Sequence, residues 1–287
     1  MEEIIKKLII IGCGKIGQAA GIALSELPLE VVGIRRSLSK ENLPFKMFPL
    51  DIFSADFENQ IKIINPNFAI YCVSSDNQTE KSYQKNYVDG LMLTIKILNK
   101  IENFQHLFFT SSTRVYGQIS DNFLSELESP KPSDSGGKIL FAAEKSLKNV
   151  NFNTTILRLS GIYGDKRRHM LELASDLSRW PTEDRWTNRI HEEDVVSFIY
   201  YLFFQIIENK KIENLYLLTD NHPVTLFEVL KWIRLELKLP LNVLNKANQI
   251  KGKRLKSKIL PTLNFSLKHP NYKSGYRQMI SRMNKTN

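Results

Sequence analysis

The chain has 287 residues, of which 42% are hydrophobic and 24% charged, so it can bury a large core and is not globally disordered. Forty Lys and Arg residues against thirty Asp and Glu residues give a formal net charge of +10, which favours anionic partners without choosing among phosphates, nucleotides, nucleic acid and acidic metabolites. Two cysteines, Cys13 and Cys72, are too few for a disulfide scaffold or a four-cysteine zinc site.

Strand-like and helix-like segments alternate along the first half of the chain. Short β-branched or aromatic apolar runs predict strands over residues 7–11, 30–35, 45–50, 68–73, 106–111 and 154–159. Helices are expected over residues 15–26, 79–101 and 137–150. This order predicts an α/β fold with a Rossmann-type, doubly wound parallel sheet.

The second half of the chain has a looser pattern. It predicts a helix over residues 192–207, a strand over 215–218 and a helix over 225–237, which Thr225 and Glu228 would start with a capping box. We expect one domain over residues 1–165 and a smaller C-terminal α/β lobe over 166–287, partly interleaved with the first.

The sequence shows no signal for secretion or membrane insertion. The first residues are acidic, and the longest apolar run, residues 195–204, is too short to cross about 30 Å of hydrocarbon. The expectation is a cytoplasmic protein without a membrane partner.

A glycine-rich turn follows the first predicted strand. Gly12, Gly14 and Gly17 form a G-x-G-x-x-G motif that opens the first predicted helix, with Lys15 and Ile16 inside it. The glycines allow a tight turn, a close approach of the backbone to a pyrophosphate, and close packing of the helix on the strand. The helix start offers N–H groups to the phosphates. The first domain is therefore predicted to bind a dinucleotide.

The residues after the second strand indicate which dinucleotide. Sites that prefer NAD usually carry Asp or Glu about 20 residues after the glycines, where it binds the ribose hydroxyls. Here the sequence has Arg35, Arg36 and Ser37 instead. Two guanidinium groups and a hydroxyl can bind a 2′-phosphate, so NADP(H) is favoured, with NAD possible.

Four segments resemble one known family. They are Gly12 to Gly17, residues 110–117 (TSSTRVYG), residues 157–164 (LRLSGIYG) and residues 188–195 (NRIHEEDV). In this order and at this spacing they resemble the short-chain dehydrogenase/reductase superfamily, in its extended and atypical branch of NAD-dependent epimerase/dehydratase-like proteins.

The resemblance implies roles for individual residues. Ser112 matches the Ser or Thr that hydrogen-bonds the reacting oxygen of the substrate. The matches to cofactor contacts are Asp51 near the adenine, Val73 and Ser74 beside the ribose, Ser111 at the end of the fifth strand, and Gly161 and Ile162 beside the nicotinamide.

The chain departs from the family at its acid–base pair. The family has a Tyr followed four residues later by a Lys, and these positions fall on Gly136 and Leu140. Another group must then supply the proton if the protein is an enzyme. The candidates are Tyr116, Tyr163, His191 and Lys138.

Two basic clusters, residues 166–169 and 246–258, lie in the second half of the chain. No nucleic-acid-binding module accompanies them, so they are expected to be either solvated loops or loops that select a small anionic substrate. The histidines show no metal-ligand spacing, and no metal is expected.

The sequence thus predicts an NADP(H)-using oxidoreductase, a reductase or dehydrogenase of a small or nucleotide-linked carbonyl or hydroxyl compound. The alternatives are an NADP(H)-binding sensor without turnover and a sugar-nucleotide epimerase or dehydratase. The resemblance also implies a homodimer formed through the helices at 79–101 and 137–150.

Overall fold

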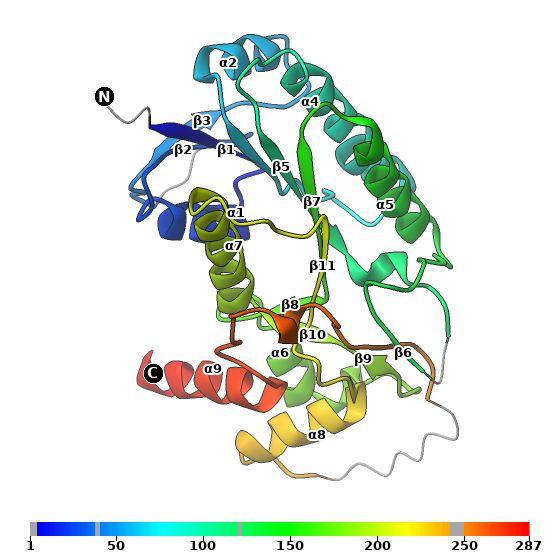
Figure 1. Cartoon of the computed structure of the whole chain (residues 1–287). Helices are drawn as coiled ribbons and strands as arrows, with labels where there is room; N and C mark the ends of the chain where they lie inside the picture. The colour runs from blue at the N-terminus through cyan, green and yellow to red at the C-terminus, as the bar shows by residue number, and fades with distance from the viewer. Residues whose placement is uncertain (1–4, 38–40, 120–121, 242–249, 287) are drawn as a thin grey trace. The chain divides into compact units, whose positions relative to one another are not determined.

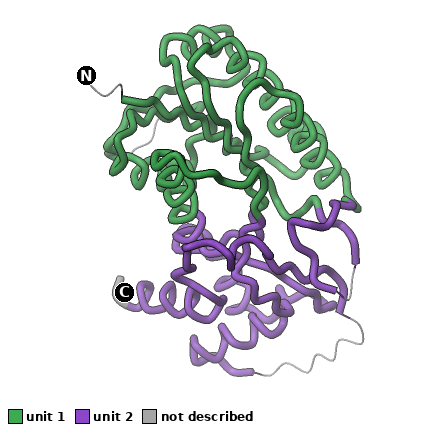
Figure 2. The backbone as a smooth tube through the Cα atoms, in the orientation of Figure 1, with its two compact units in different colours: residues 1–115, 132–158, 196–216 green, residues 116–131, 159–195, 217–287 purple. Residues whose placement is uncertain are grey.

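The computed structural model describes residues 5–37, 41–119, 122–241 and 250–286. They form two compact units, each assembled from several stretches of the chain (Figure 2). The first unit contains residues 1–115, 132–158 and 196–216, and the second contains residues 116–131, 159–195 and 217–287.

A seven-stranded sheet forms the centre of the first unit. Its strands are β1 (Lys6–Ile11), β2 (Leu29–Arg35), β3 (Lys46–Pro49), β4 (Phe68–Tyr71), β5 (His106–Ser112), β7 (Asn153–Leu159) and β11 (Leu215–Leu218). Their order is β11-β7-β5-β4-β1-β2-β3, and the pairs from β3 across to β5 are parallel. The strand order reverses at β1, between β2 and β4. Sheets of this kind bind ligands in the crevice outside the carboxyl ends of the strands at such a reversal.

Helices cover both faces of this sheet (Figure 1). They are α1 (Lys15–Leu24), α2 (Asp56–Ile64), α3 (Glu80–Tyr83), α4 (Gly90–Leu98), α5 (Ser135–Ser146) and most of α7 (Glu192–Ile207). The arrangement confirms the predicted doubly wound α/β fold. The helix α2 was not among the predicted elements, although Phe57, Ile61 and Ile64 give it a buried apolar face.

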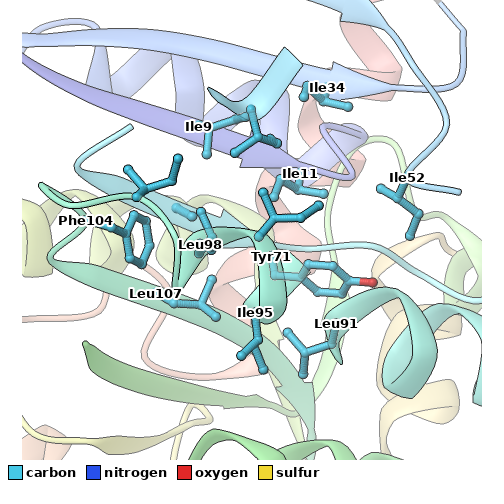
Figure 3. Packing of buried hydrophobic residues seen from close by; sticks show 14 of the residues in the cluster. Ile9, Ile11, Ile34, Ile52, Tyr71, Leu91, Ile95, Leu98, Phe104 and Leu107 are labelled. Carbon is cyan, nitrogen blue, oxygen red and sulfur yellow. The ribbon is translucent and has the colours of Figure 1, made fainter. Parts of the chain in front are cut away.

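The alternation of side chains along the strands explains the two layers of helices. Ile9 and Ile11 of β1 pack with Tyr71 of β4 and with Leu91 and Ile95 of α4 (Figure 3). The residue between them, Ile10, points to the other face, where Gly17 and Gly21 let α1 approach closely. Burying each such Ile or Leu contributes about 1.5–3 kcal/mol.

The predicted helix over residues 79–101 forms with an interruption. After α3 the chain makes a π-helical segment, Gln84–Asp89, and then continues as α4. The wider turn shifts the positions of Lys85 and Asn86, which bears on the site described below. Such π segments recur at functional sites in other proteins.

The second unit combines short strands with three helices that share one core. The strands are β6 (Phe123–Leu124), β8 (Gly161–Tyr163), β9 (Trp186–Thr187), β10 (Arg189–His191), β12 (Val224–Thr225) and β13 (Arg254–Leu255). The helices are α6 (His169–Ser175), α8 (Leu226–Glu236) and α9 (Tyr272–Thr286). Buried side chains of all three helices form a single hydrophobic cluster. Thr225 caps α8 by accepting the backbone N–H of Glu228, as predicted. Among the described residues, no helix has the length and apolar composition needed to cross a bilayer.

A buried histidine on β5 makes the stability of the first unit depend on pH. His106 is 7% exposed, and its Nε2 lies 2.9 Å from the hydroxyl oxygen of Thr155. Burial lowers the pKa of His106 from 6.5 to about 4. As the pH falls, the unfolded chain binds this proton before the folded protein does. The stability is therefore complete above the unfolded pKa and is lost below it.

Between pH 7 and pH 5, we expect His106 to lower the free energy of unfolding by about 2 kcal/mol. His106→Gln removes the titrating group, so urea denaturation should show a smaller loss of stability over this interval than in the wild type. The exposed His222 supplies the matched control, and His222→Gln should lose as much stability as the wild type. Equal pH slopes for wild type and His106→Gln would contradict the prediction.

Candidate functional site

The glycine turn joins the end of β1 to the start of α1. The backbone N–H groups of Gly12 and Cys13 donate to the Ile34 carbonyl at 3.0 and 2.9 Å, which ties the turn to β2. Gly12 has a φ of 79°, in the left-handed region, and a Cβ built on it would lie 2.5 Å from the backbone nitrogen of Val73. Only glycine fits this position without moving β4.

The start of α1 has no side-chain cap. Its N-cap residue is Gly14, and Lys15, Ile16 and Gly17 form the first turn. Backbone N–H groups at a helix start, together with the helix dipole, attract phosphate groups. The space beside Gly14 is open, because the nearest atom to a Cβ built there is the Gly12 carbonyl oxygen at 3.8 Å.

Most of the predicted cofactor contacts line one pocket in the first unit. The pocket lies at the carboxyl ends of β1, β2, β3 and β4, and its predicted residues are Gly12, Gly14, Arg35, Arg36, Ser37, Asp51, Val73 and Ser74. The pocket has a cavity volume of about 200 Å³ and opens to solvent. Predicted cofactor residues from separate segments of the sequence thus lie together in this pocket.

The two arginines of the pocket differ in their partners. Arg35 donates through Nη2 to the hydroxyl of Ser37 at 3.2 Å. Arg36 instead forms a two-point ion pair with Asp76, with Nη1 lying 3.2 Å from Oδ2 and Nη2 donating to Oδ1. The hydrogen bonds that Arg36 donates to Asp76 raise the pKa of Arg36 and lower the pKa of Asp76.

Sequence reasoning missed six residues of the pocket lining, and the two that come from the helical region after β4 are Lys85 and Asn86. Both belong to the π-helical segment, and the Asn86 carbonyl accepts a hydrogen bond from the hydroxyl of Tyr71 at 2.5 Å. The Lys85 ammonium lies over the ring of Phe53, 4.9 Å from its centre. The apolar periodicity of the helix gave no signal for the π turn that brings these side chains to the pocket.

The end of β5 carries Ser111 and Ser112, which have different partners. The Ser111 hydroxyl donates to Glu144 Oε1 at 2.6 Å, inside a buried network. Ser112 is half-buried, and its Oγ accepts the backbone N–H of Arg114 at 3.2 Å. Of the two serines, Ser112 is therefore the more exposed residue.

An arginine fills the space of the expected tyrosine at the start of α5. A Cβ built on Gly136 would lie 2.7 Å from Arg114 Cζ. The guanidinium of Arg114 donates to the hydroxyl of Tyr83 at 2.7 Å and to Asp134 at 2.9 Å. The space beside Gly136 therefore holds a permanent cation.

Further predicted residues lie in the second unit. Gly161, Ile162 and Tyr163 form β8, which pairs in parallel with β10, so that Tyr163 lies opposite His191 with 5.0 Å between the ring centres. The two side chains are 3% and 1% exposed, and no described residue satisfies the Tyr163 hydroxyl or His191 Nε2. Burial raises the pKa of Tyr163 and lowers that of His191 to about 4. Near neutral pH the phenol keeps its proton and the imidazole is neutral.

The hydroxyl of Tyr116 has a structural partner. The side chain is fully buried in the second unit, and its hydroxyl donates to the Ser125 carbonyl at 2.8 Å.

Three residues with metal-binding atoms lie together in the second unit, although their spacing in the sequence gave no sign of it. His191, Glu193 and His269 each offer one ligand atom, and these atoms lie within 4.8 Å of one another. Glu193 already forms ion pairs with Lys268 and with Arg282, the latter at 3.2 Å. Two cations therefore neutralise this carboxylate, and we treat the cluster as structural.

Several cations of the two basic clusters have partners in the second unit. Arg254 lies over the rings of Phe123 and Trp186, 4.9 and 5.2 Å from their centres. Lys251 pairs with Glu183 at 3.0 Å. Residues 246–249 of this cluster lie outside the described residues.

Solved structures match nearly the whole chain. No protein-family model and no curated protein sequence matches it. A solved structure from Methylobacillus flagellatus, named for the NAD-dependent epimerase/dehydratases, is 33% identical, with a TM-score of 0.87 over 98% of this chain and 99% of that one. The UDP-glucose 4-epimerase of Thermotoga maritima, solved with UDP-glucose, is 16% identical, with a TM-score of 0.80 over 98% and 99% of the two chains. The UDP-glucose 4-epimerase of Thermus thermophilus, solved with NAD, is 15% identical, with a TM-score of 0.78 over 98% and 100%.

Proposed function

The chain belongs to the NAD-dependent epimerase/dehydratase family, and on this premise we propose that it is an enzyme that binds NAD(P) in the pocket of its first unit and acts on a sugar nucleotide. The observation that carries the proposal is the pocket at the reversal of strand order, where the uncapped start of α1 meets the ends of β2, β3 and β4.

The pocket residues fit the two halves of such a cofactor. The open space beside Gly14 and the N–H groups at the start of α1 suit the diphosphate. Arg35, Ser37 and Asp51 lie at the ends of the neighbouring strands, where they would contact the adenosine. Because Arg35 and Ser37 offer donors to a 2′-phosphate, we propose that NADP(H) binds more tightly than NAD(H).

The bound nicotinamide would supply hydride transfer to or from a carbon of the substrate. The role we propose for Ser112 is to hydrogen-bond the oxygen on that carbon. Arg114 would stabilise negative charge near this position, but a guanidinium stays protonated and cannot pass the proton. Tyr163 remains our proposed proton donor, because its phenol is protonated and unsatisfied among the described residues.

The substrate class is proposed from the relatives and from charge. Two structures with this fold are UDP-glucose 4-epimerases, and the net charge of +10 favours an anionic, nucleotide-linked sugar over a neutral compound. We therefore favour a sugar-nucleotide epimerase or dehydratase over a simple reductase.

A second candidate function is dinucleotide binding without turnover. It is favoured by Gly136 and by Leu140, which is 1% exposed, at the positions of the family's Tyr and Lys. Incubation with UDP-glucose and other nucleoside diphosphate sugars, with NAD⁺ or NADP⁺ present, separates the two functions. A changed sugar or a change in cofactor absorbance supports the enzyme. Tight cofactor binding without either change supports the second function.

The cofactor assignment predicts a selective loss of affinity in Arg35→Ala. A charge-assisted hydrogen bond to the 2′-phosphate contributes about 1.5–3 kcal/mol, so the Kd for NADP⁺ should rise about 10- to 100-fold, whereas the Kd for NAD⁺ should change less than about threefold. Isothermal titration calorimetry measures both constants.

Lys62→Ala is a matched control for the loss of one positive charge. Lys62 is half-exposed on α2 of the same unit and pairs with Glu58, so its loss should leave both Kd values unchanged. Equal weakening of NAD⁺ and NADP⁺ by Arg35→Ala would contradict the proposed 2′-phosphate contact. Failure of the wild type to bind either dinucleotide would overturn the proposed function.

A further inference from the structure

Arg36 faces the pocket but is already paired with a carboxylate. Both of its terminal nitrogens contact Asp76, and these side chains are 62% and 41% exposed. A guanidinium binds carboxylate and phosphate through the same planar set of donors. A phosphate that reached Arg36 would therefore have to displace Asp76.

The loop between β4 and α3 holds Asp76 in place. The backbone N–H of Asp76 donates to the hydroxyl of Ser82 at 3.1 Å, and the Ser75 hydroxyl lies 2.9 Å from the same oxygen. Asn77 Oδ1 accepts the backbone N–H of Thr79 at 3.1 Å. The backbone of Asp76 is thus held by its own loop, independently of the ion pair with Arg36.

The neighbouring arginine has no such competitor. Arg35 donates to the uncharged Ser37 hydroxyl, and no carboxylate among the described residues forms an ion pair with it. The pocket therefore contains one arginine available to an anion and one that is held by an acid. The sequence, which shows Arg35 and Arg36 side by side, could not distinguish them.

From this asymmetry we infer that Asp76 sets the dinucleotide specificity of the pocket by competing with the 2′-phosphate of NADP(H) for Arg36. The inference rests on the proposed function, and it names the residue that limits the preference for NADP(H). NAD(H) has no 2′-phosphate, so its binding is independent of this competition. Asp76 thereby keeps the affinities for NADP(H) and NAD(H) closer together than they would be if both arginines were unpaired.

The test is Asp76→Asn, measured by calorimetric titration with NAD⁺ and NADP⁺. The substitution keeps the size and the loop hydrogen bonds of the residue but removes its negative charge. The substitution releases Arg36 from its exposed ion pair and also removes the repulsion between the Asp76 carboxylate and a nearby phosphate, so the Kd for NADP⁺ should fall about three- to tenfold. The Kd for NAD⁺ should stay within about twofold of wild type, and higher salt should reduce the gain.

A double-mutant cycle shows whether the effect passes through Arg36. In the Arg36→Ala background, Asp76→Asn should improve NADP⁺ binding much less than in the wild type, because no guanidinium is left to release. An equal gain in both backgrounds would overturn the competition, since Asp76 would then act by direct repulsion.

Glu30→Gln is the matched control for the loss of one exposed negative charge. Glu30 lies near the start of β2, at the opposite end from the pocket, and pairs with Lys7 at 3.8 Å. Its substitution should leave the ratio of the two Kd values unchanged. If the wild type binds both dinucleotides and Asp76→Asn leaves their ratio unchanged, this inference alone is wrong. If the wild type binds neither, the proposed function fails first.

Discussion

Gly12→Ala is expected to abolish measurable binding of NAD(P) and to lower the free energy of unfolding by about 2–4 kcal/mol. Two costs add. The φ of 79° is unfavourable for any residue with a Cβ, and that Cβ would lie 2.5–2.8 Å from backbone atoms of Cys72 and Val73. Backbone atoms cannot rotate away as a side chain can. The turn and the end of β4 must therefore separate, and the pocket between them changes shape. Urea denaturation and calorimetric titration measure the two effects.

Gly14→Ala separates the effect on the ligand from the effect on the fold. Gly14 has a φ of −84°, which alanine adopts freely, and the nearest atom to its Cβ is 3.8 Å away. The free energy of unfolding of Gly14→Ala should stay within about 0.5 kcal/mol of the wild-type value. The added methyl group would enter the space proposed for the diphosphate, so the variant should bind the dinucleotide more weakly. Wild-type affinity in both glycine variants would show that the dinucleotide does not bind at this turn.

The sheet could be predicted from sequence because buried parallel strands carry a strong local signal. Residues 7–11 and 106–111 are short, continuous apolar runs, and they form β1 and β5. The glycine motif after β1 indicated where the ligand pocket would lie, since a G-x-G-x-x-G turn between strand and helix has a specific backbone requirement. Gly12 meets that requirement with its positive φ.

Other parts of the site depend on contacts between distant segments, and no local pattern reports them. Arg36 and Asp76 are 40 positions apart, and Arg114 reaches Gly136 at the start of α5. The absence of the family's tyrosine was visible in the sequence. What replaces it was not, because the direction of a long arginine side chain is decided by its partners, here Tyr83 and Asp134. Lys85 was missed for a different reason, since the π turn leaves the apolar periodicity of its helix nearly unchanged.

The largest expected effect on stability comes from the buried ion pair of Glu144 and Arg158, which contacts Ser111. Glu144 accepts hydrogen bonds from Arg158 at 2.7 and 3.0 Å and from Ser111 at 2.6 Å. The Arg158 and Glu144 side chains are 5% and 3% exposed. Removing one partner of such a pair leaves a buried charge without its counterion, at a cost of about 3–5 kcal/mol.

We therefore expect Glu144→Ala to lower the free energy of unfolding by about 3–5 kcal/mol in urea denaturation. Glu58→Gln, which removes an exposed carboxylate that pairs with Lys62 and Lys100, should lower the stability much less than Glu144→Ala does.

The double variant Glu144→Leu, Arg158→Met tests the cause, because it removes both charges and keeps apolar volume in the core. It should be more stable than Glu144→Ala, since replacing a complete buried pair by apolar residues is often neutral. If the double variant is as unstable as Glu144→Ala, lost packing and not the unpaired Arg158 explains the cost. The position of Ser111 would then depend on the shape of Glu144 more than on its charge.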